Sequence, residues 1–338
     1  MQYLKELSDL YGVSGFEDNV RDYICTIIKG KCEYHIDNLG DIIAFKQGRK
    51  RPAHKIMVAA HMDEVGMIAT YICDNGTIKF DTVGGINADV IAGRQVVFCS
   101  SGITGAVGMK AVHHLSRESR KKPVSKDNLY IDIGASSRQE AEKYVRCGDY
   151  ISFCSDYFNM GNDIICGKAL DDRAGCAVML SMIESDLEYD TYFAFNVQEE
   201  VGLRGAAASA YSIDPDFAVV LEATTASDIS GVTGHKRVCV LGQGPAVSFM
   251  DRRTIYDREM YNIAFETAKA NSINCQTKTM VAGGNDSGVI HTSRSGVRTL
   301  AVSVPCRYLH SPHCIIKRSD LLDMKKLTML LIQRVAVL

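Results

Sequence analysis

The apolar residues in the first 60 positions of the chain form two kinds of pattern, one with helical spacing and one that is an uninterrupted run. Residues 2–11 and 14–30 carry apolar side chains three and four positions apart, which predicts two helices. Ser14 and Glu17 fit a capping box at the start of the second helix. The run "KIMVAA" at residues 55–60 is apolar almost without interruption, and it predicts a buried strand.

The pattern changes between Gly66 and about Tyr157. Short β-type runs alternate there with glycine turns, and only residues 137–145 show helical spacing. The β-type runs are residues 77–84, 94–102, 103–108, 129–134 and 150–154. This succession of short strands and glycine turns indicates a small barrel or sandwich that is inserted into another domain.

Strands and helices alternate again after residue 169. The helices expected there are residues 173–185, 204–211, 257–270 and 320–335. The strands expected outside the insertion are two within 34–45, then 55–60, 191–197, 217–223, 278–283 and 298–305. This order predicts an α/β fold, in which helices flank a mostly parallel sheet on both faces. We expect a discontinuous α/β domain of residues 1–65 and 160–338, with a β-barrel-like insertion at residues 66–159.

Composition and charge narrow the class of protein. A chain of 338 residues suggests about two domains, and 46% hydrophobic with 23% charged residues is typical of a soluble globular protein. The formal net charge of -2 gives no general attraction to nucleic acid or to an anionic membrane, so neither is expected as a partner.

The cysteines indicate a reducing compartment. Twelve cysteines are spread from Cys25 to Cys314, and no two of them are spaced as CxxC. The start of the chain lacks the apolar core of a signal peptide, and no run approaches 18 apolar residues. We therefore expect free thiols in a cytoplasmic protein, and no cysteine-rich structural zinc site.

Histidines and carboxylates follow the predicted strands at the point where each strand ends. Ligands bind at the carboxyl edge of such sheets, so these side chains are expected to lie close together. The residues concerned are His61, Glu199, Glu200, Glu222 and His310, and Asp171 is expected beside them at the start of the helix that follows the insertion. Any one of them alone fits an ordinary solvated loop, but the set exceeds what solubility requires.

Imidazole and carboxylate ligands together suit zinc, cobalt or manganese. A shared carboxylate can hold two ions roughly 3.5–4 Å apart, and they clamp a water for attack on a carbonyl. A further carboxylate can take the proton of that water. Adjacent Glu199 and Glu200 suit the roles of base and ligand, provided that the backbone bends there, near Gly202 and Gly205.

Six segments in order carry a resemblance to a known family. They are "AAHMDEVG", "ALDDRAG", "VQEEVGLRGA", "VLEATTASD", "GGNDSG" and "PCRYLHSP". With them the chain resembles the dinuclear metallo-aminopeptidases that include glutamyl aminopeptidase and the tetrahedral aminopeptidases. The resemblance covers nearly the whole chain, including the β-rich insertion, and it implies a zinc-peptidase-like catalytic domain with an inserted dimerisation or lid domain.

The resemblance also implies roles for individual residues. One ion would be bound by His61, Asp171 and Glu222, and the other by Asp171, Glu200 and His310. Glu199 would be the general base, and Asp63 would orient the imidazole of His61. The chain departs from the family pattern at Glu222, where many relatives have Asp, and at Asp172, where they often have Asn. Neither change removes a ligand.

The implied activity is release of N-terminal residues from peptides that have a free N-terminus. The cofactors would be two divalent ions per subunit, zinc or cobalt first and manganese next, and dimers would assemble into a homo-dodecamer. A preference for N-terminal Glu or Asp would require a cation in the first side-chain pocket. The candidates for that cation are Lys236, Arg252, Arg253 and Arg294.

Three other functions stay open on the sequence alone. A metallo-deacylase or carboxypeptidase could use the same metals on the same scaffold. A glycoside hydrolase could use Glu199 and Glu200 as its pair of carboxyls, but it would leave His61 and His310 unexplained. A non-catalytic binding protein would be expected to have lost a ligand or the base, and the chain retains all of them.

Overall fold

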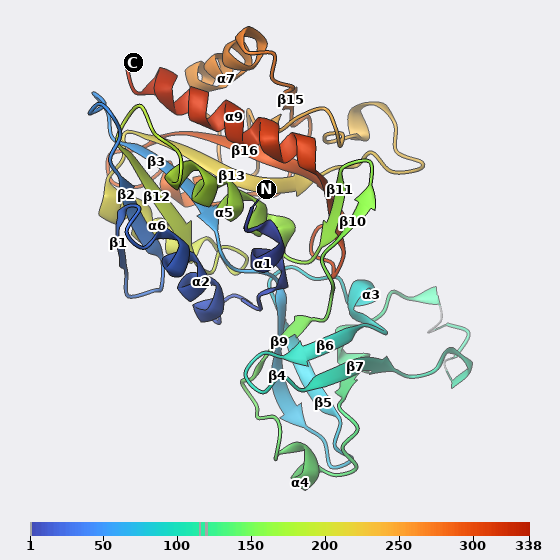
Figure 1. Cartoon of the computed structure of the whole chain (residues 1–338). Helices are drawn as coiled ribbons and strands as arrows, with labels where there is room; N and C mark the ends of the chain where they lie inside the picture. Colours follow the sequence, from blue (N-terminus) through green and yellow to red (C-terminus); the bar gives the residue numbers. More distant parts are fainter. Residues whose placement is uncertain (1, 115, 119–120) are drawn as a thin grey trace.

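The computed structural model describes residues 2–114, 116–118 and 121–338 (Figure 1). One large sheet carries helices on both faces, and a separate β-barrel lies beyond one edge of this layer structure. The predicted α/β class is therefore confirmed. No helix within the described ranges is both long enough and apolar enough to span a bilayer.

The large sheet has eleven strands among the described residues. They are β1 (Glu33–Ile36), β2 (Ile42–Lys46), β3 (Ile56–His61), β10 (Phe158–Gly161), β11 (Ile164–Gly167), β12 (Thr191–Asn196), β13 (Phe217–Thr225), β14 (Ala246–Val247), β15 (Gln276–Thr277), β16 (Arg298–Arg307) and β17 (Cys314–Lys317). The order is β1-β2-β12-β3-β13-β16-β17-β11-β10, with β14 beside β16 and β15 beside β14. The central strands β12, β3, β13 and β16 are parallel, whereas the pairs toward both edges are antiparallel. The prediction of a mostly parallel sheet was therefore wrong, because strands distant in the sequence add antiparallel pairs on both sides of a parallel centre.

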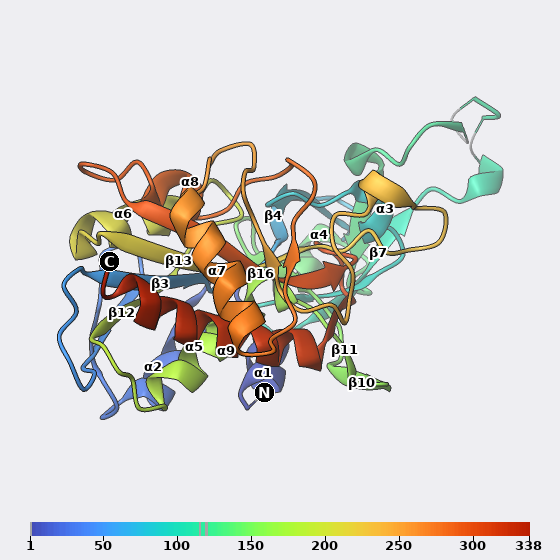
Figure 2. The same cartoon turned by 90° about the horizontal axis from the view of Figure 1, so that it is seen from above.

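Helices bury both faces of the parallel centre. One face packs against α1 (Leu4–Asp9), α2 (Asp18–Ile28), α5 (Leu170–Ile183), α7 (Arg258–Ala270) and α9 (Arg318–Val335). The other face packs against α6 (Arg204–Ile213) and α8 (Ser287–Ile290). Figure 2 shows α7 and α9 side by side across the sheet. The central strand β3 is apolar along its length because Val58 faces one cluster and Ala59 the other.

The inserted segment forms a closed barrel with its own core. Its strands are β4 (Gly66–Ile72), β5 (Ile78–Val83), β6 (Gln95–Phe98), β7 (Thr104–Met109), β8 (Leu129–Asp132) and β9 (Tyr150–Phe153). They close antiparallel in the order β4-β5-β8-β7-β6-β9. The short helices α3 (Ala88–Ile91) and α4 (Arg138–Ala141) and the 3-10 turns η1 (Val112–His114) and η3 (Lys126–Asn128) connect these strands, and η4 (Gly234–Lys236) lies outside the barrel. Domain boundaries at residues 66 and 159 stay a prediction.

Two local predictions were wrong. The helix α2 begins at Asp18, and Glu17 makes no side-chain cap, so there is no capping box. Instead, the Ser14 hydroxyl donates to Asp63 Oδ2 at 2.6 Å, and the Glu17 carboxylate accepts from the backbone N–H groups of Gly15 and Gln198. The strand expected at residues 278–283 is also absent. The strand β15 ends at Thr277, Lys278 adds one more backbone hydrogen bond to Val247, and Lys278, Met280 and Ala282 line a cavity.

Candidate functional site

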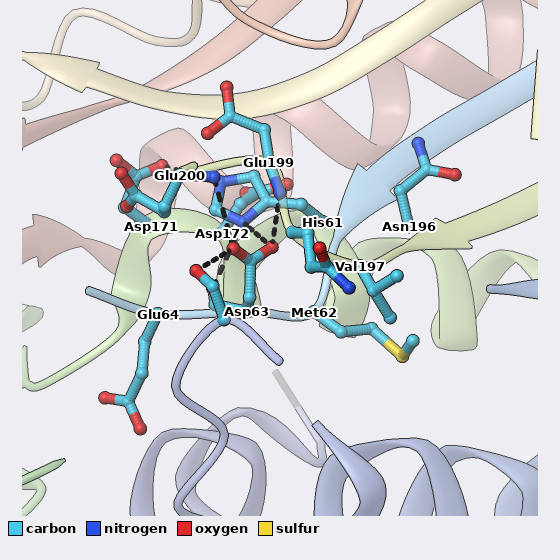
Figure 3. Close-up of polar contacts among 12 residues, drawn as sticks. His61, Met62, Asp63, Glu64, Asp171, Asp172, Asn196, Val197, Glu199 and Glu200 are labelled. Atoms are coloured by element: carbon cyan, nitrogen blue, oxygen red, sulfur yellow. Dashed lines mark hydrogen bonds and ion pairs between the residues drawn. The ribbon is translucent and has the colours of Figure 1, made fainter. Parts of the chain in front are cut away.

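The carboxyl ends of the parallel strands bring the predicted polar residues together (Figure 3). His61 is the last residue of β3, and Glu222 lies within β13. Glu199 and Glu200 follow the end of β12, and His310 follows the end of β16. Asp171 lies in the first turn of α5, and Asp63 directly follows β3. All seven residues named from the sequence therefore lie around one point of the sheet edge.

Two groups of three side chains share Asp171. His61 Nε2 lies 3.5 Å from Asp171 Oδ1 and 3.7 Å from Glu222 Oε2. His310 Nε2 lies 3.6 Å from Asp171 Oδ2 and 3.4 Å from Glu200 Oε1. Zinc bonds of roughly 2.0–2.1 Å place tetrahedral ligand atoms about 3.4 Å apart, so both groups have the spacing of a metal site. The two oxygens of Asp171 thus face different histidines.

A third combination of side chains also meets the spacing of a metal site. One ligand atom each from His61, Glu199 and Glu200 lie within 4.8 Å of one another, as they do in the two groups that share Asp171. By spacing alone, Glu199 is therefore a further candidate for a metal ligand.

The carboxylates outnumber the groups that could neutralise them. Burial raises the pKa of Glu199 and of Glu222 well above the ordinary value, and it raises the pKa of Glu200 to about 7. Asp171 Oδ1 and Glu222 Oε1 are buried and have no hydrogen-bond partner. Buried acceptors without a donor are costly, and a divalent cation would satisfy them. The residues present therefore fit a metal centre.

Asp63 holds the turn that carries the two glutamates. Its Oδ1 accepts from the backbone N–H of Glu199 at 2.9 Å, and its Oδ2 accepts from that of Glu200 at 3.1 Å. The same carboxylate lies 3.4 Å from His61 Nδ1. The backbone bends here as expected, because Gln198 and Gly202 both have positive φ, 56° and 125°. Asp63 therefore positions two strand ends at once.

The barrel positions the imidazole of His310. Its Nδ1 lies 2.7 Å from the backbone oxygen of Gly85, in the connection between β5 and α3. A neutral imidazole that donates from Nδ1 presents Nε2 as the acceptor, which is the form that binds metal. Sequence reasoning missed Gly85, because a backbone carbonyl leaves no signature in the sequence.

Three buried polar residues beside the turn of Glu199 and Glu200 form a chain of hydrogen bonds. Asp286 Oδ2 accepts from Asn196 Nδ2 at 2.7 Å, and Asn196 Oδ1 accepts from the Ser209 hydroxyl at 2.7 Å. Burial raises the pKa of Asp286 to about 6. Asn196 is the last residue of β12, so this chain of hydrogen bonds fixes the strand from which Glu199 follows.

A cavity of about 300 Å³ opens from the acidic residues. Beyond His61, His310 and the carboxylates, its lining includes Thr224, Thr225, Ser227, Val238, Lys278, Met280, Ala282 and Asn285. None of the four cations proposed from the sequence lines it. Arg294, for example, stacks on the ring of Tyr211 and lies 3.5 Å from Asp214. Lys278 was missed because its segment reads as a strand.

Comparison with known proteins finds relatives along almost the whole chain. The profile of the M42 glutamyl aminopeptidase family matches residues 40–327. A putative aminopeptidase of Acetivibrio thermocellus is 40% identical over 328 residues, which are 96% of each chain. A glutamyl aminopeptidase of Lactococcus lactis subsp. cremoris and a lysyl aminopeptidase of Pyrococcus furiosus are each 31% identical. They cover 95% and 92% of this chain, and the matches span 92% and 90% of their own lengths.

Solved structures show the same fold. A TET aminopeptidase from a marine-sediment archaeon, Thaumarchaeota archaeon SCGC AB-539-E09, has a TM-score of 0.94 at 34% identity, covering 99% of this chain and 96% of that one. The Pyrococcus horikoshii TET1 peptidase, which can assemble into a tetrahedron or a large octahedral shell, has a TM-score of 0.86 at 33% identity, covering 97% of both chains.

Proposed function

The chain belongs to the M42 glutamyl aminopeptidase family and is a metal-dependent aminopeptidase, and we propose that two divalent ions at the sheet edge carry its reaction. One ion would be held by His61, Asp171 and Glu222, and the other by Asp171, Glu200 and His310. The observation that supports this ligand set most directly is the placement of the two Asp171 oxygens, 3.5 Å from one histidine and 3.6 Å from the other.

The roles of the other residues follow from their positions. Bound ions supply Lewis acidity and lower the pKa of a coordinated water to about 7. The carboxylate of Glu199 would take the proton of the attacking water and return it to the leaving amine, because it lies beside His61 and Glu200 and is not needed in either group of ligands. Asp63 keeps Glu199 in place through the backbone. The carboxylate-rich end of the cavity binds the α-ammonium group of the substrate.

We further propose the identity of the ions and the assembly. Zinc or cobalt suits the imidazole and carboxylate donors, with manganese as a third choice. The chain forms a homo-oligomer in which dimers build a dodecamer, as the tetrahedral assembly of the TET1 peptidase suggests. The insertion at residues 66–159 acts as its dimerisation and lid domain. A cytoplasmic location stays a prediction.

Hydrolysis of aminoacyl p-nitroanilides tests the reaction. Each free substrate is paired with its N-acetylated form, and the assay is run with a chelator and after zinc, cobalt or manganese is added back. We expect cleavage of the free substrates only, abolished by the chelator and restored by metal. Glu199→Gln should retain its metal but lose about 10²–10⁴-fold in kcat. Release of acetate from the acetylated substrates, without release of p-nitroaniline from the free ones, would favour a deacylase and overturn the proposal.

A further inference from the structure

We propose that Cys306 and Cys314 form an oxidative modification site, at which a small peroxide joins the two thiols in a reversible disulfide and displaces His310. This inference rests on the proposed function, because His310 is one of the proposed ligands of the second ion, and it adds a regulation of that ion. Both cysteines are free and buried. The proposed reaction uses neither of them, so their thiols are available for another role.

The two cysteines lie on neighbouring strands and point to the same face of the sheet. The strands β16 and β17 are antiparallel, and Cys306 lies opposite Ile316. Side chains two positions apart on a strand share a face, so Cys314 lies diagonally across from Cys306 on that face. Both side chains belong to one core cluster, with exposed fractions of 0% and 2%. The two thiols are hydrogen-bonded to each other, so no side chain separates the sulfur atoms.

The chain between the two cysteines carries His310 at its centre. In this connection both Tyr308 and His310 have a positive φ, 59° and 56°. Non-glycine residues rarely adopt this backbone conformation, so the connection is held in place by its contacts. Cys314 supplies two of these contacts, because its Sγ lies 3.5 Å from the backbone oxygen of Tyr308 and 3.6 Å from that of Ser311. A movement of Cys314 therefore changes the support of His310.

Forming the disulfide requires the backbone near His310 to move. Diagonal neighbours in an antiparallel pair have Cα atoms about 7–8 Å apart, whereas a disulfide spans about 4.4–6.8 Å between them. Closure of the bond therefore draws Cys314 toward Cys306 by about 1 Å. His310 Nε2 lies 3.6 Å from Asp171 Oδ2 and 3.4 Å from Glu200 Oε1 in the reduced chain, and metal bonds tolerate changes of only about 0.2 Å. We expect the oxidised chain to bind the second ion more weakly.

The substrate cavity gives a small molecule access to Cys314. This cysteine lines a second cavity, of about 10 Å³, together with Asp171, Glu200 and His310. The same three residues also line the substrate cavity of about 300 Å³, so the two cavities adjoin. The smaller cavity has room for roughly one water molecule. Hydrogen peroxide is only slightly larger than water, whereas glutathione disulfide is far too large to enter, so the expected oxidant is a small peroxide.

The reaction is the oxidation of two thiols by one peroxide, which is reduced to two water molecules. The thiolate of Cys314 attacks one oxygen of hydrogen peroxide, the O–O bond breaks, and the leaving hydroxide takes up the thiol proton to form water. The thiol of Cys306 then attacks the resulting sulfenic acid, an S–S bond forms, and the S–O bond breaks with release of the second water. A dithiol such as dithiothreitol reverses the oxidation by thiol–disulfide exchange.

Cys314 differs in its acidity from other buried cysteines. The hydrogen bond from Cys306 lowers the pKa of the Cys314 thiol below its ordinary value. Burial instead raises the pKa of Cys239 and of Cys275 to about 12. The thiolate is the form of cysteine that attacks a peroxide, so Cys314 is expected to react before these two.

Peptide mapping and metal analysis of the metal-loaded full chain test the proposal. Trypsin cuts after Arg307, so Cys306 and Cys314 fall in separate peptides, residues 299–307 and 308–317. After treatment with hydrogen peroxide and alkylation of the remaining thiols, we expect these two peptides to be joined. Bound metal should fall from two ions toward one per subunit, and kcat/KM on a free aminoacyl p-nitroanilide should fall by about 10- to 100-fold. Dithiothreitol followed by renewed addition of metal should reverse these changes, and glutathione disulfide should cause none of them.

Variants separate the disulfide from other damage by peroxide. Cys306→Ala cannot form the bond, so its metal content and activity should not show the reversible loss. Cys314→Ser gives the same test from the other strand, in case either substitution disturbs the core. Cys25→Ser is the matched control, since this half-buried cysteine lies on α2, and it should respond to peroxide as the wild type does. Oxidised methionines are not restored by dithiothreitol, so they do not imitate the reversible loss.

The outcomes separate this inference from the proposed function. Loss of activity without the joined peptides, or a link from Cys314 to Cys166 instead, would overturn the modification site. Joined peptides with an unchanged metal content would overturn the displacement of His310. If the wild type cleaves no free substrate with any metal, the proposed function fails, whereas joined peptides with a loss of bound metal still support the modification site.

Discussion

Two buried groups of charged residues lie on opposite sides of the segment that follows β3, and they differ in charge balance. The paired cluster consists of Glu64, Lys168 and Arg173. Lys168 Nζ lies 2.8 and 3.0 Å from the two Glu64 oxygens, and Arg173 Nη2 lies 3.9 Å away. Gly12 and Ser152 also donate to Glu64. Figure 3 shows Glu64 directed away from His61.

The acidic cluster consists of Asp171, Glu199, Glu200 and Glu222 with His61 and His310. It has more carboxylates than cations, and it leaves Asp171 Oδ1 and Glu222 Oε1 without a hydrogen bond. Both clusters are buried, so burial of charge does not by itself mark a functional site. The difference lies in the sign of the excess charge. The paired cluster has two cations for one carboxylate, with Arg173 Nη2 left without a hydrogen bond, whereas the acidic cluster has more carboxylates than cations and would be neutralised by metal ions.

The largest effect is expected from Asp171→Asn, which breaks the acidic cluster at the residue shared by both groups of ligands. An amide cannot bridge two ions as a carboxylate does, so kcat/KM should fall by at least about 10³-fold. Metal analysis of the purified variant should show less than the wild-type content. A variant that keeps two ions per subunit and full activity would show that Asp171 is not the bridge.

Glu64→Gln removes the carboxylate of the paired cluster and should lower the free energy of unfolding. It leaves Lys168 and Arg173 buried without a counter-charge, and removing one partner of a buried pair costs about 3–5 kcal/mol. Urea unfolding of the chelated protein measures this. The control is Glu184→Gln, which removes the partly exposed pair with Lys31 and should cost less than about 1 kcal/mol. Equal losses in the two variants would contradict the contrast between the clusters.

Asp63→Asn tests the support of the acidic cluster. Asp63 is not among the proposed ligands, but it contacts His61 and both N–H groups of the glutamate turn. Loss of such a supporting carboxylate lowers metal affinity by about 10–100-fold. Titration calorimetry with zinc or cobalt gives the affinity directly. An unchanged affinity would assign Asp63 to the fold alone.

The smallest effect is a pH dependence at the rim of the acidic cluster. Burial raises the pKa of Glu17 to about 7 from its ordinary 4.5. Between these values the folded chain binds more protons than the unfolded chain, so stability should fall as pH rises from 4.5 to 7. The expected contribution is about 1–2 kcal/mol in the chelated protein. In Glu17→Gln the unfolding free energy should fall less over the same range, and parallel curves would refute the assignment.

The sequence predicted those features that depend on position along a strand. His61 and Glu222 could be placed at one edge because parallel strands end on the same side of a sheet. The predictions failed where a distant partner decides the local structure. Ser14 donates to Asp63 instead of capping a helix, and Lys278 lines a cavity although its neighbours suit a strand. The antiparallel flanks of the sheet were not predicted either, because β11 pairs with β17, from which it is separated in the sequence by all the elements from α5 to β16.

The hydrogen bond between His310 and Gly85 also bears on how the site is completed during synthesis. Domains generally fold as units while the chain is made, from the N-terminus onward. The barrel strands end at Phe153, so the carbonyl that orients the imidazole is in place long before the ribosome reaches His310. His310, the last proposed ligand in the sequence, is therefore synthesised after the barrel that carries its partner Gly85. The second proposed metal site is thus completed only after the barrel strands have been synthesised.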